Sequence, residues 1–199
     1  MHMWATYLSI VALGIPAFGQ DQFVTPAPLK GPSYELALGY DYLAMQNPSA
    51  HKIALNGLNV EGGVEFDSRW GAAVDFSYVR NSDVLSSHRG GYVLSLLAGP
   101  ELYLKRFRTA RMFSHVLVGA GLVDGAVPTN DGYLYGWISR PSFGIGGGVE
   151  KSFHAPFGVR AYGDYVRTSF ANSLAAVEPQ NNFRCGVSFA FRLPFKRAP

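Results

Sequence analysis

The chain has 199 residues, enough for one domain with a sizeable core and too few for two domains of ordinary size. Aromatic residues make up 14%, charged residues only 16%, and glycine occurs 23 times, which favours an all-β protein with one face in a nonaqueous setting. The mild net charge of +3 and the lack of a long basic stripe make nucleic acid an unexpected partner, and the single Cys185 excludes an intramolecular disulfide.

The beginning of the chain resembles an export signal. Trp4–Ile15 is a short apolar run, and Ala17-x-Gly19 is typical of a cleavage site. We therefore predict a signal peptide over residues 1–19 and an irregular lead-in over residues 20–32, where prolines interrupt regular structure. The segment before the apolar run has no Lys or Arg, so a buried strand or helix is the alternative.

Eight stretches of alternating apolar and polar residues follow, and this period of two predicts β-strands. They are Ser33–Leu43, Leu55–Phe66, Trp70–Arg80, Gly91–Leu104, Met112–Val123, Pro141–Glu150, Phe157–Thr168 and Asn182–Leu193. Each has about the length of a tilted membrane strand, roughly 9–11 residues. Long polar connections follow every second strand, at Met45–Ala54, Asn81–Gly90, Asp124–Arg140 and Ser169–Asn181. Long loops alternating with short turns are typical of outer-membrane barrels, with the loops outside the cell.

The last strand carries the clearest pattern. Its apolar face alternates with small or charged residues, and Arg184, Gly186, Phe189 and Phe191 fit the pattern polar-x-Gly-x-x-aromatic-x-aromatic. This pattern resembles the C-terminal signal of bacterial outer-membrane β-barrels, which the barrel-assembly machinery recognises. The short tail over residues 194–199 departs from barrels that stop at the terminal aromatic residue.

Alternation alone does not tell whether the apolar faces point inward, as in a soluble lipocalin-type barrel, or outward to lipid. No lysine lies within a predicted strand, although solvated strand faces usually carry lysine. The polar faces are rich in Gly, Ala and Ser, which a narrow eight-stranded interior requires. Aromatic residues edge the apolar faces, as expected for rings at a membrane interface: Tyr40, Tyr42, Tyr78, Tyr92, Tyr165, Trp70, Phe157 and Phe191. We therefore expect the apolar faces to meet lipid.

With its strands placed, the chain after Gln20 resembles the small outer-membrane barrels of the OmpA and OmpX type. The resemblance rests on strand count, loop alternation and the pattern of the last strand. It implies an all-β, eight-stranded antiparallel up-and-down transmembrane β-barrel over residues 33–193, in the outer membrane of a Gram-negative bacterium. Its expected partners are outer-membrane lipids, the barrel-assembly machinery and an external ligand that meets the loops.

Charged residues on the polar faces should point into the lumen. They are Glu35, Asp41, Glu61, Glu65, Asp75, Glu101, Glu150, Arg160, Asp164, Arg184 and Arg192. Buried charges must be paired and hydrogen-bonded, so these side chains are expected to form a salt-bridge network that fills the barrel. The alternative is a polar path for a small solute or ion, in which the acidic excess would favour cations.

The turn Lys105–Arg111 is basic, and we expect Lys105, Arg106, Arg108 and Arg111 either to meet phosphates of the inner leaflet or to form a plain solvated turn. The glycine-rich stretch Gly144–Gly148 superficially resembles a phosphate loop. No lysine-serine pair or helix-forming segment follows it, so strand glycines are the better interpretation.

Three functions follow from this interpretation. The first is a structural or surface-interaction protein whose loops meet external partners, the second a small pore or transporter for ions or apolar solutes, and the third a lipid A-modifying enzyme. No acid-base set assembles around neighbours such as Ser114-His115 or Ser152-His154, and His51 and His88 lie in loops. We therefore predict no enzyme, no cofactor and no metal site.

Overall fold

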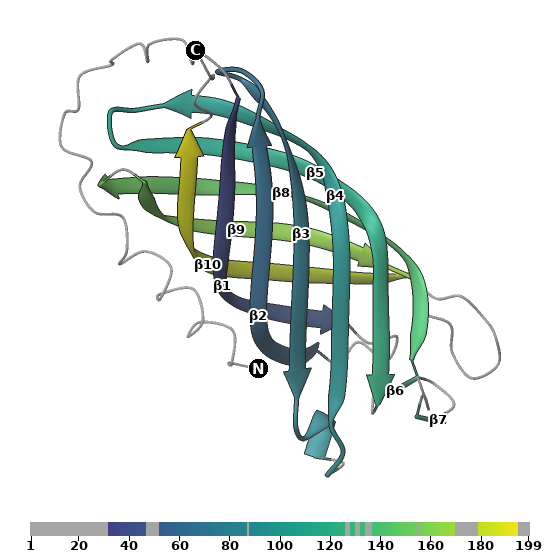
Figure 1. Ribbon diagram of the computed structural model, residues 1–199. Helices are drawn as coiled ribbons and strands as arrows, with labels where there is room; N and C mark the ends of the chain where they lie inside the picture. Colours follow the sequence, from purple (N-terminus) through teal and green to yellow (C-terminus); the bar gives the residue numbers. More distant parts are fainter. Residues whose placement is uncertain are drawn as a thin grey trace, which may run out of the picture.

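The computed structural model describes residues 32–46, 52–86, 88–125, 128–129, 132–133, 137–154, 156–169 and 179–194. The predicted signal peptide and residues 195–199 of the tail lie outside this part of the chain. Eight long strands form one closed barrel (Figure 1): β1 (Ser33–Gln46), β2 (Lys52–Glu65), β3 (Trp70–Asn81), β4 (Gly91–Arg106), β5 (Ala110–Gly125), β8 (Ile138–His154), β9 (Phe157–Thr168) and β10 (Gln180–Pro194). The predicted fold class is confirmed.

All pairings in the barrel are antiparallel, and β1 closes it by pairing with both β2 and β10. In Figure 1 the purple first strand accordingly lies beside the yellow last strand. Two short strands, β6 (Pro128–Thr129) and β7 (Gly132–Tyr133), pair with each other in the connection between β5 and β8. Because each barrel strand has a neighbour on both sides, no sheet edge is left to be satisfied by water, as hydrocarbon requires.

The long connections and short turns alternate as predicted, but most strands extend further than the sequence indicated. Gln46 pairs with Lys52, so the predicted loop Met45–Ala54 is wrong at five of its ten residues, and the other five, 47–51, lie outside the described residues. Ile53 and Leu55 are buried inside the barrel, and burial of these apolar side chains favours continuation of the strand. The strand extensions also include Lys52, Lys105 and Lys151, which are exposed at strand ends, where lysine reaches water.

The apolar faces point outward, away from the lumen. Val118 and Phe189 are 59% and 54% exposed, whereas Asp75 and Arg160 are each 1% exposed. A soluble barrel would bury the first pair and expose the second. The lipocalin-type alternative is therefore excluded, and the outer surface is an apolar band suited to lipid tails.

Aromatic side chains edge this band at both ends of the barrel. Towards the loops, the Tyr40 hydroxyl donates to Asn56 Oδ1 at 2.6 Å, and the Tyr165 hydroxyl donates to Asn181 Oδ1 at 2.5 Å. Towards the turns, the Phe157 ring packs against the rings of Phe189 and Phe191, with centroids 5.6 and 5.4 Å apart. Amphipathic and aromatic rings at these two levels mark the membrane interfaces.

Inside the barrel, an apolar cluster fills the end nearest the loops, which we call the outer cluster. It consists of Leu43, Met45, Ile53, Leu55, Val79, Val84, Val93 and Val123, with Ile138 packed against it. Val84 comes from the short 3-10 helix η1 (Val84–Ser86) between β3 and β4, so this connection folds back over the lumen. The outer cluster is not evident from the sequence, because several of its residues fall in predicted loops that belong to strand extensions or to η1.

Local chemistry sets the ends of two hairpins. In the turn between β2 and β3, the Asp67 carboxylate accepts hydrogen bonds from the backbone N–H groups of Arg69 and Trp70, at 2.6 and 2.9 Å, and the Arg69 bond in particular lowers the pKa of Asp67. At the other end, Gly125 has φ +91°, and a Cβ there would lie 2.3 Å from the Gly90 carbonyl oxygen, so only glycine fits. Within the described residues, no helix is long and apolar enough to cross a membrane.

The outward apolar band predicts a depth-dependent penalty for charge. Leu38 lies midway along β1 and Leu104 near the turn end of β4, and both are exposed on the outer face. We expect Leu38→Arg to lower the free energy of unfolding in lipid vesicles by about 2–4 kcal/mol, and Leu104→Arg by about 0–1 kcal/mol. Urea unfolding followed by tryptophan fluorescence measures both. Equal penalties at the two positions would contradict the proposed membrane depth.

Candidate functional site

The inward faces of the strands place ionisable side chains in the lumen, and this lumen is the candidate site. All eleven charged residues that the sequence analysis assigned to the interior lie on the inner face. Most are buried, and Arg192 at the turn end is the most exposed, with 29% of its side chain accessible. The side chains gather at three levels along the barrel.

At the level nearest the turns, Arg111 is the centre of the network. Its Nη1 donates to Glu65 at 2.9 Å, its Nη2 donates to Glu150 at 2.6 Å, and it also pairs with Glu35. Arg192 pairs with Glu35 at 3.1 Å and with Glu150. Three carboxylates thus converge on two guanidinium groups from β5 and β10.

Arg106 and Arg111 do not belong to a plain solvated turn, one of the two arrangements expected from the sequence, because both side chains turn inward. Arg111 belongs to β5, and its side chain is buried on the inner face. Arg106 ends β4 and pairs with Glu65 inside the barrel, because a bulge between Tyr103 and Lys105 shifts the alternation of that strand. Arg111 lies four residues before His115 on the same strand, so both side chains point to the same face. This spacing was the signal in the sequence that could have placed Arg111 in the lumen.

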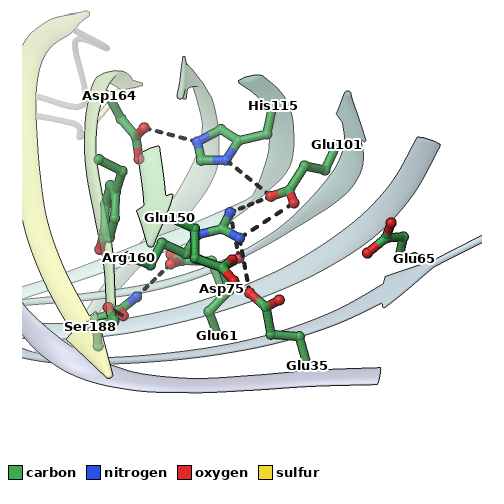
Figure 2. A network of polar contacts seen from close by, with 12 residues as sticks. Glu35, Glu61, Glu65, Asp75, Glu101, His115, Glu150, Arg160, Asp164 and Ser188 are labelled. Atoms are coloured by element: carbon green, nitrogen blue, oxygen red, sulfur yellow. Dashed lines mark hydrogen bonds and ion pairs between the residues drawn. The ribbon is translucent and has the colours of Figure 1, made fainter. Parts of the chain in front are cut away.

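At the middle level, Arg160 joins carboxylates from β1, β2 and β4 (Figure 2). Its Nη2 lies 2.9 Å from Glu61 and pairs with Glu101, and its Nη1 lies 3.2 Å from Glu35. His115 extends the chain of contacts: its Nε2 lies 2.9 Å from Asp164, and its Nδ1 lies 3.9 Å from Glu101. His115 was not among the predicted network residues, although its inward parity was visible in the sequence.

At the outer level, Arg184 takes the central place. Its Nη1 donates to Asp75 at 2.5 Å and its Nη2 to Asp164 at 2.6 Å, while Asp41 lies 3.8 Å away. Asp41 also accepts hydrogen bonds from Ser77, at 2.7 Å, and from Tyr162. Asp164, which contacts both Arg184 and His115, therefore links the outer level to the middle one.

Aromatic rings separate the guanidinium groups and cover their faces. Tyr103, Phe113 and Tyr162 pack together inside the barrel. The Arg160 guanidinium carbon lies 3.6 Å from the Phe113 ring centroid, and that of Arg111 lies 4.5 Å from the Tyr103 centroid. These cation–π contacts replace part of the hydration that the arginines lose on burial.

Gly186 makes room for one of these rings. A Cβ at this position would lie 2.4 Å from Asp41 Oδ1 and 2.6 Å from the Tyr162 hydroxyl oxygen, so a larger residue would break the contact between Tyr162 and Asp41. Arg184 likewise points into the lumen, whereas Phe189 lies exposed on the lipid face. Each residue thus has a role in the folded barrel. The assembly signal of Arg184, Gly186, Phe189 and Phe191 stays a prediction.

The charges in the network do not balance. Its carboxylates are Glu35, Asp41, Glu61, Glu65, Asp75, Glu101, Glu150 and Asp164, and its cations are Arg106, Arg111, Arg160, Arg184 and Arg192, with His115 as a further ionisable group. The carboxylates outnumber the guanidinium groups, so a mobile cation is the charge that this interior favours. Such an arrangement binds or repels ions, but it offers no nucleophile poised beside a base.

The serine and histidine residues considered for catalysis do not form a pair of nucleophile and base among the described residues. His115 is buried in the lumen, whereas the neighbouring Ser114 lies on the opposite face of β5. The His154 side chain, His51 and Ser49 lie outside the described residues. Among the described residues, no group of three His, Cys, Asp or Glu side chains could hold a metal ion.

The network predicts a large penalty when one buried cation is removed. Arg160→Ala leaves Glu35, Glu61 and Glu101 without their shared partner, and we expect it to lower the free energy of unfolding by about 3–5 kcal/mol. Arg167→Ala is the matched control, because Arg167 lies on the same strand, is exposed and forms no ion pair with a described residue. Urea unfolding in vesicles measures both, and equal losses would contradict the network's contribution.

Comparisons with known proteins bear on the fold. No protein-family model matches the chain, and no curated protein matches its sequence. Among solved structures, Ail of Yersinia pestis matches with a TM-score of 0.58 and 16% identity, covering 82% of this chain and 99% of Ail. Neisserial surface protein A matches with a TM-score of 0.58 and 12% identity, covering 85% of this chain and 100% of its own.

The outer membrane protein AlkL, solved in lipid bilayers, matches with a TM-score of 0.51 and 11% identity, covering 88% of this chain and 97% of AlkL. At sequence identities this low, the structural similarity shows the fold and does not show the activity. The closed eight-stranded sheet, its apolar outer band and its charged lumen agree with these matches. The chain therefore has the fold of the small eight-stranded β-barrels of bacterial outer membranes.

Proposed function

We propose that this protein is a non-conducting outer-membrane barrel with a structural or surface-interaction role, whose external loops meet partners outside the cell. The observation that carries the proposal is the filled lumen. Arg111, Arg160 and Arg184 bridge opposite walls of the barrel at three successive levels. Each bridge occupies the cross-section that a solute would need.

The outer cluster blocks the lumen a second time, at the end nearest the loops. Between this cluster and Arg184 lies a cavity of about 20 Å³, lined by Leu43, Ser77, Val79, Val93 and neighbouring side chains. A volume of this size holds about one water molecule. An ion entering from the loop side would have to shed its water against apolar side chains before it reached the first carboxylate, and that desolvation is costly.

The alternative function is a cation-selective pore, and the acidic excess in the lumen favours it. Passage would require the guanidinium groups to swing away from two or three carboxylates each. Breaking buried ion pairs of this kind costs several kcal/mol per partner. The static barrel therefore supports the non-conducting role over the pore.

The loop end offers a charged surface for external ligands. Among the described residues, Lys52, Arg80, Arg89 and Arg167 are exposed at this end, with Asp83 as an exposed acidic residue. Ail, whose fold is similar, has been solved in complex with sucrose octasulfate, a heparin analogue (TM-score 0.52, 18% identity, covering 81% of this chain and 99% of Ail). This supports a sulfated or otherwise anionic external ligand for the present chain.

Conductance tests the non-conducting role. We expect purified protein in planar lipid bilayers to give no regular single-channel steps, because three levels of ion pairs and the outer cluster fill the lumen. The folded state is verified beforehand by heat-modifiable gel migration. Reproducible cation-selective steps from the folded protein would support the pore instead.

Binding to immobilised heparin tests the surface role. We expect retention at low salt that weakens as salt rises, because exposed charges are screened over a distance of about 10 Å at 0.1 M. Lys52→Glu combined with Arg89→Glu should weaken binding roughly tenfold, since each surface ion pair contributes up to about 1 kcal/mol. Lys105→Glu combined with Lys151→Glu makes the same charge change at the turn end and should leave binding unaltered. Equal loss in both double variants would contradict a loop-end site.

A further inference from the structure

The turn end of the barrel holds a pocket that the charge network does not fill, which we call the arginine pocket. Its volume is about 190 Å³. Its lining includes four arginines and two hydroxyl-bearing residues: Arg106, Arg108, Arg111, Arg192, Thr109 and Ser152. Among the described residues, no Asp or Glu lines it. A pocket with this lining selects an anion.

The glutamates that neutralise these arginines are not part of the lining of the arginine pocket. Glu65 binds Arg106 and Arg111, while Glu150 binds Arg111 and Arg192. The glutamates therefore fix the guanidinium groups in place without lining the pocket. A cation held in position before its ligand arrives loses little side-chain entropy on binding.

Hydrogen-bond donors remain available for a ligand. Nη1 of Arg106 and Nη1 of Arg192 have no acceptor among the described residues. Arg108 lies exposed in the turn and forms no ion pair with a described residue, so it adds a positive charge to the pocket. Several N–H donors converging from planar guanidinium groups match the geometry of a phosphate group.

A second cavity, of about 240 Å³, shares Ser152 and Arg192 with the arginine pocket. Pro156, Phe157, Gly158 and Ala190 make its walls largely apolar. Glu150 lines it as well, and its carboxylate is neutralised by Arg111 and Arg192. The Phe157 ring is partly exposed on the outer face of the barrel, where it packs against Phe189 and Phe191. The anion site thus adjoins an apolar cavity at the level of the membrane interface.

We propose that the two cavities together form a binding site for one anionic phospholipid of the periplasmic leaflet. The phosphate group lies in the arginine pocket, and the glycerol with the first part of an acyl chain lies in the apolar cavity. The turns of an outer-membrane barrel face the periplasm, where this leaflet supplies such lipids. A dissolved phosphate would leave the apolar cavity without an occupant, which is why the lipid is the better fit.

Native mass spectrometry of the folded, detergent-solubilised protein tests the site with phosphatidylglycerol as the probe. We expect one bound lipid per barrel. Diacylglycerol, which lacks the phosphate, should not be retained, and an equal concentration of inorganic phosphate should not displace the lipid. Arg108→Glu reverses a charge near the phosphate and should weaken binding about tenfold. Ser152→Trp fills the wall that the two cavities share and should abolish binding.

Lys151→Glu is the matched control, because Lys151 lies at the same end, is exposed and lines neither cavity. It should retain the lipid as the unaltered protein does. Equal weakening by Arg108→Glu and Lys151→Glu would show general charge attraction and overturn the proposal. Displacement by inorganic phosphate would identify a free-anion site, and absence of bound lipid from the unaltered protein would exclude the site altogether. Heat-modifiable migration verifies folding of every variant.

Discussion

The pairing of β1 with β10 closes the sheet, and closure leaves a lumen so narrow that each inward side chain must be small or must find a partner across it. Arg160 shows the consequence, because its guanidinium group on β9 meets glutamates that come from β1, β2 and β4. An open sheet would let these charges reach water. In the closed barrel their desolvation is offset by one another and by contacts such as that of Arg160 with the Phe113 ring, so the ion pairs and the closure depend on each other.

The same narrowness explains why aromatic rings and glycines share the interior with the charges. Tyr162 can reach Asp41 because Gly186, on the strand between them, has no Cβ to block the approach. Phe113 covers one face of the Arg160 guanidinium group, so that group is surrounded without further carboxylates. The polar faces are rich in small residues because the large inward side chains need neighbours that leave them space.

The strands and the direction of their side chains could be predicted from alternation, and the predicted bounds of Phe157–Thr168 agree with β9. Strand ends were harder, because Met45 and Ile53 fall within the predicted loop Met45–Ala54, although both are buried in the outer cluster. Parity tells which side chains point inward, but it does not tell which of them meet across the lumen. The bulge in β4 turns the Arg106 side chain inward, against the alternation of the preceding residues. No residue type in that stretch indicates the bulge. The partners of Arg111 and His115 likewise depend on register, which requires the closed barrel.

The two ends of the lumen differ in chemistry, and this difference limits what the barrel can do. The outer cluster closes the loop end with apolar side chains, whereas the turn end remains polar and contains cavities lined by Arg106, Arg111 and Arg192. The two proposed partners follow this division: a partner outside the cell would meet the loops, and the proposed lipid would meet the guanidinium groups at the turn end. The network of Arg160 and Arg184 lies between the two ends and fills the lumen there. A filled lumen between two chemically distinct ends supports the proposed structural or surface-interaction role over transport of a solute.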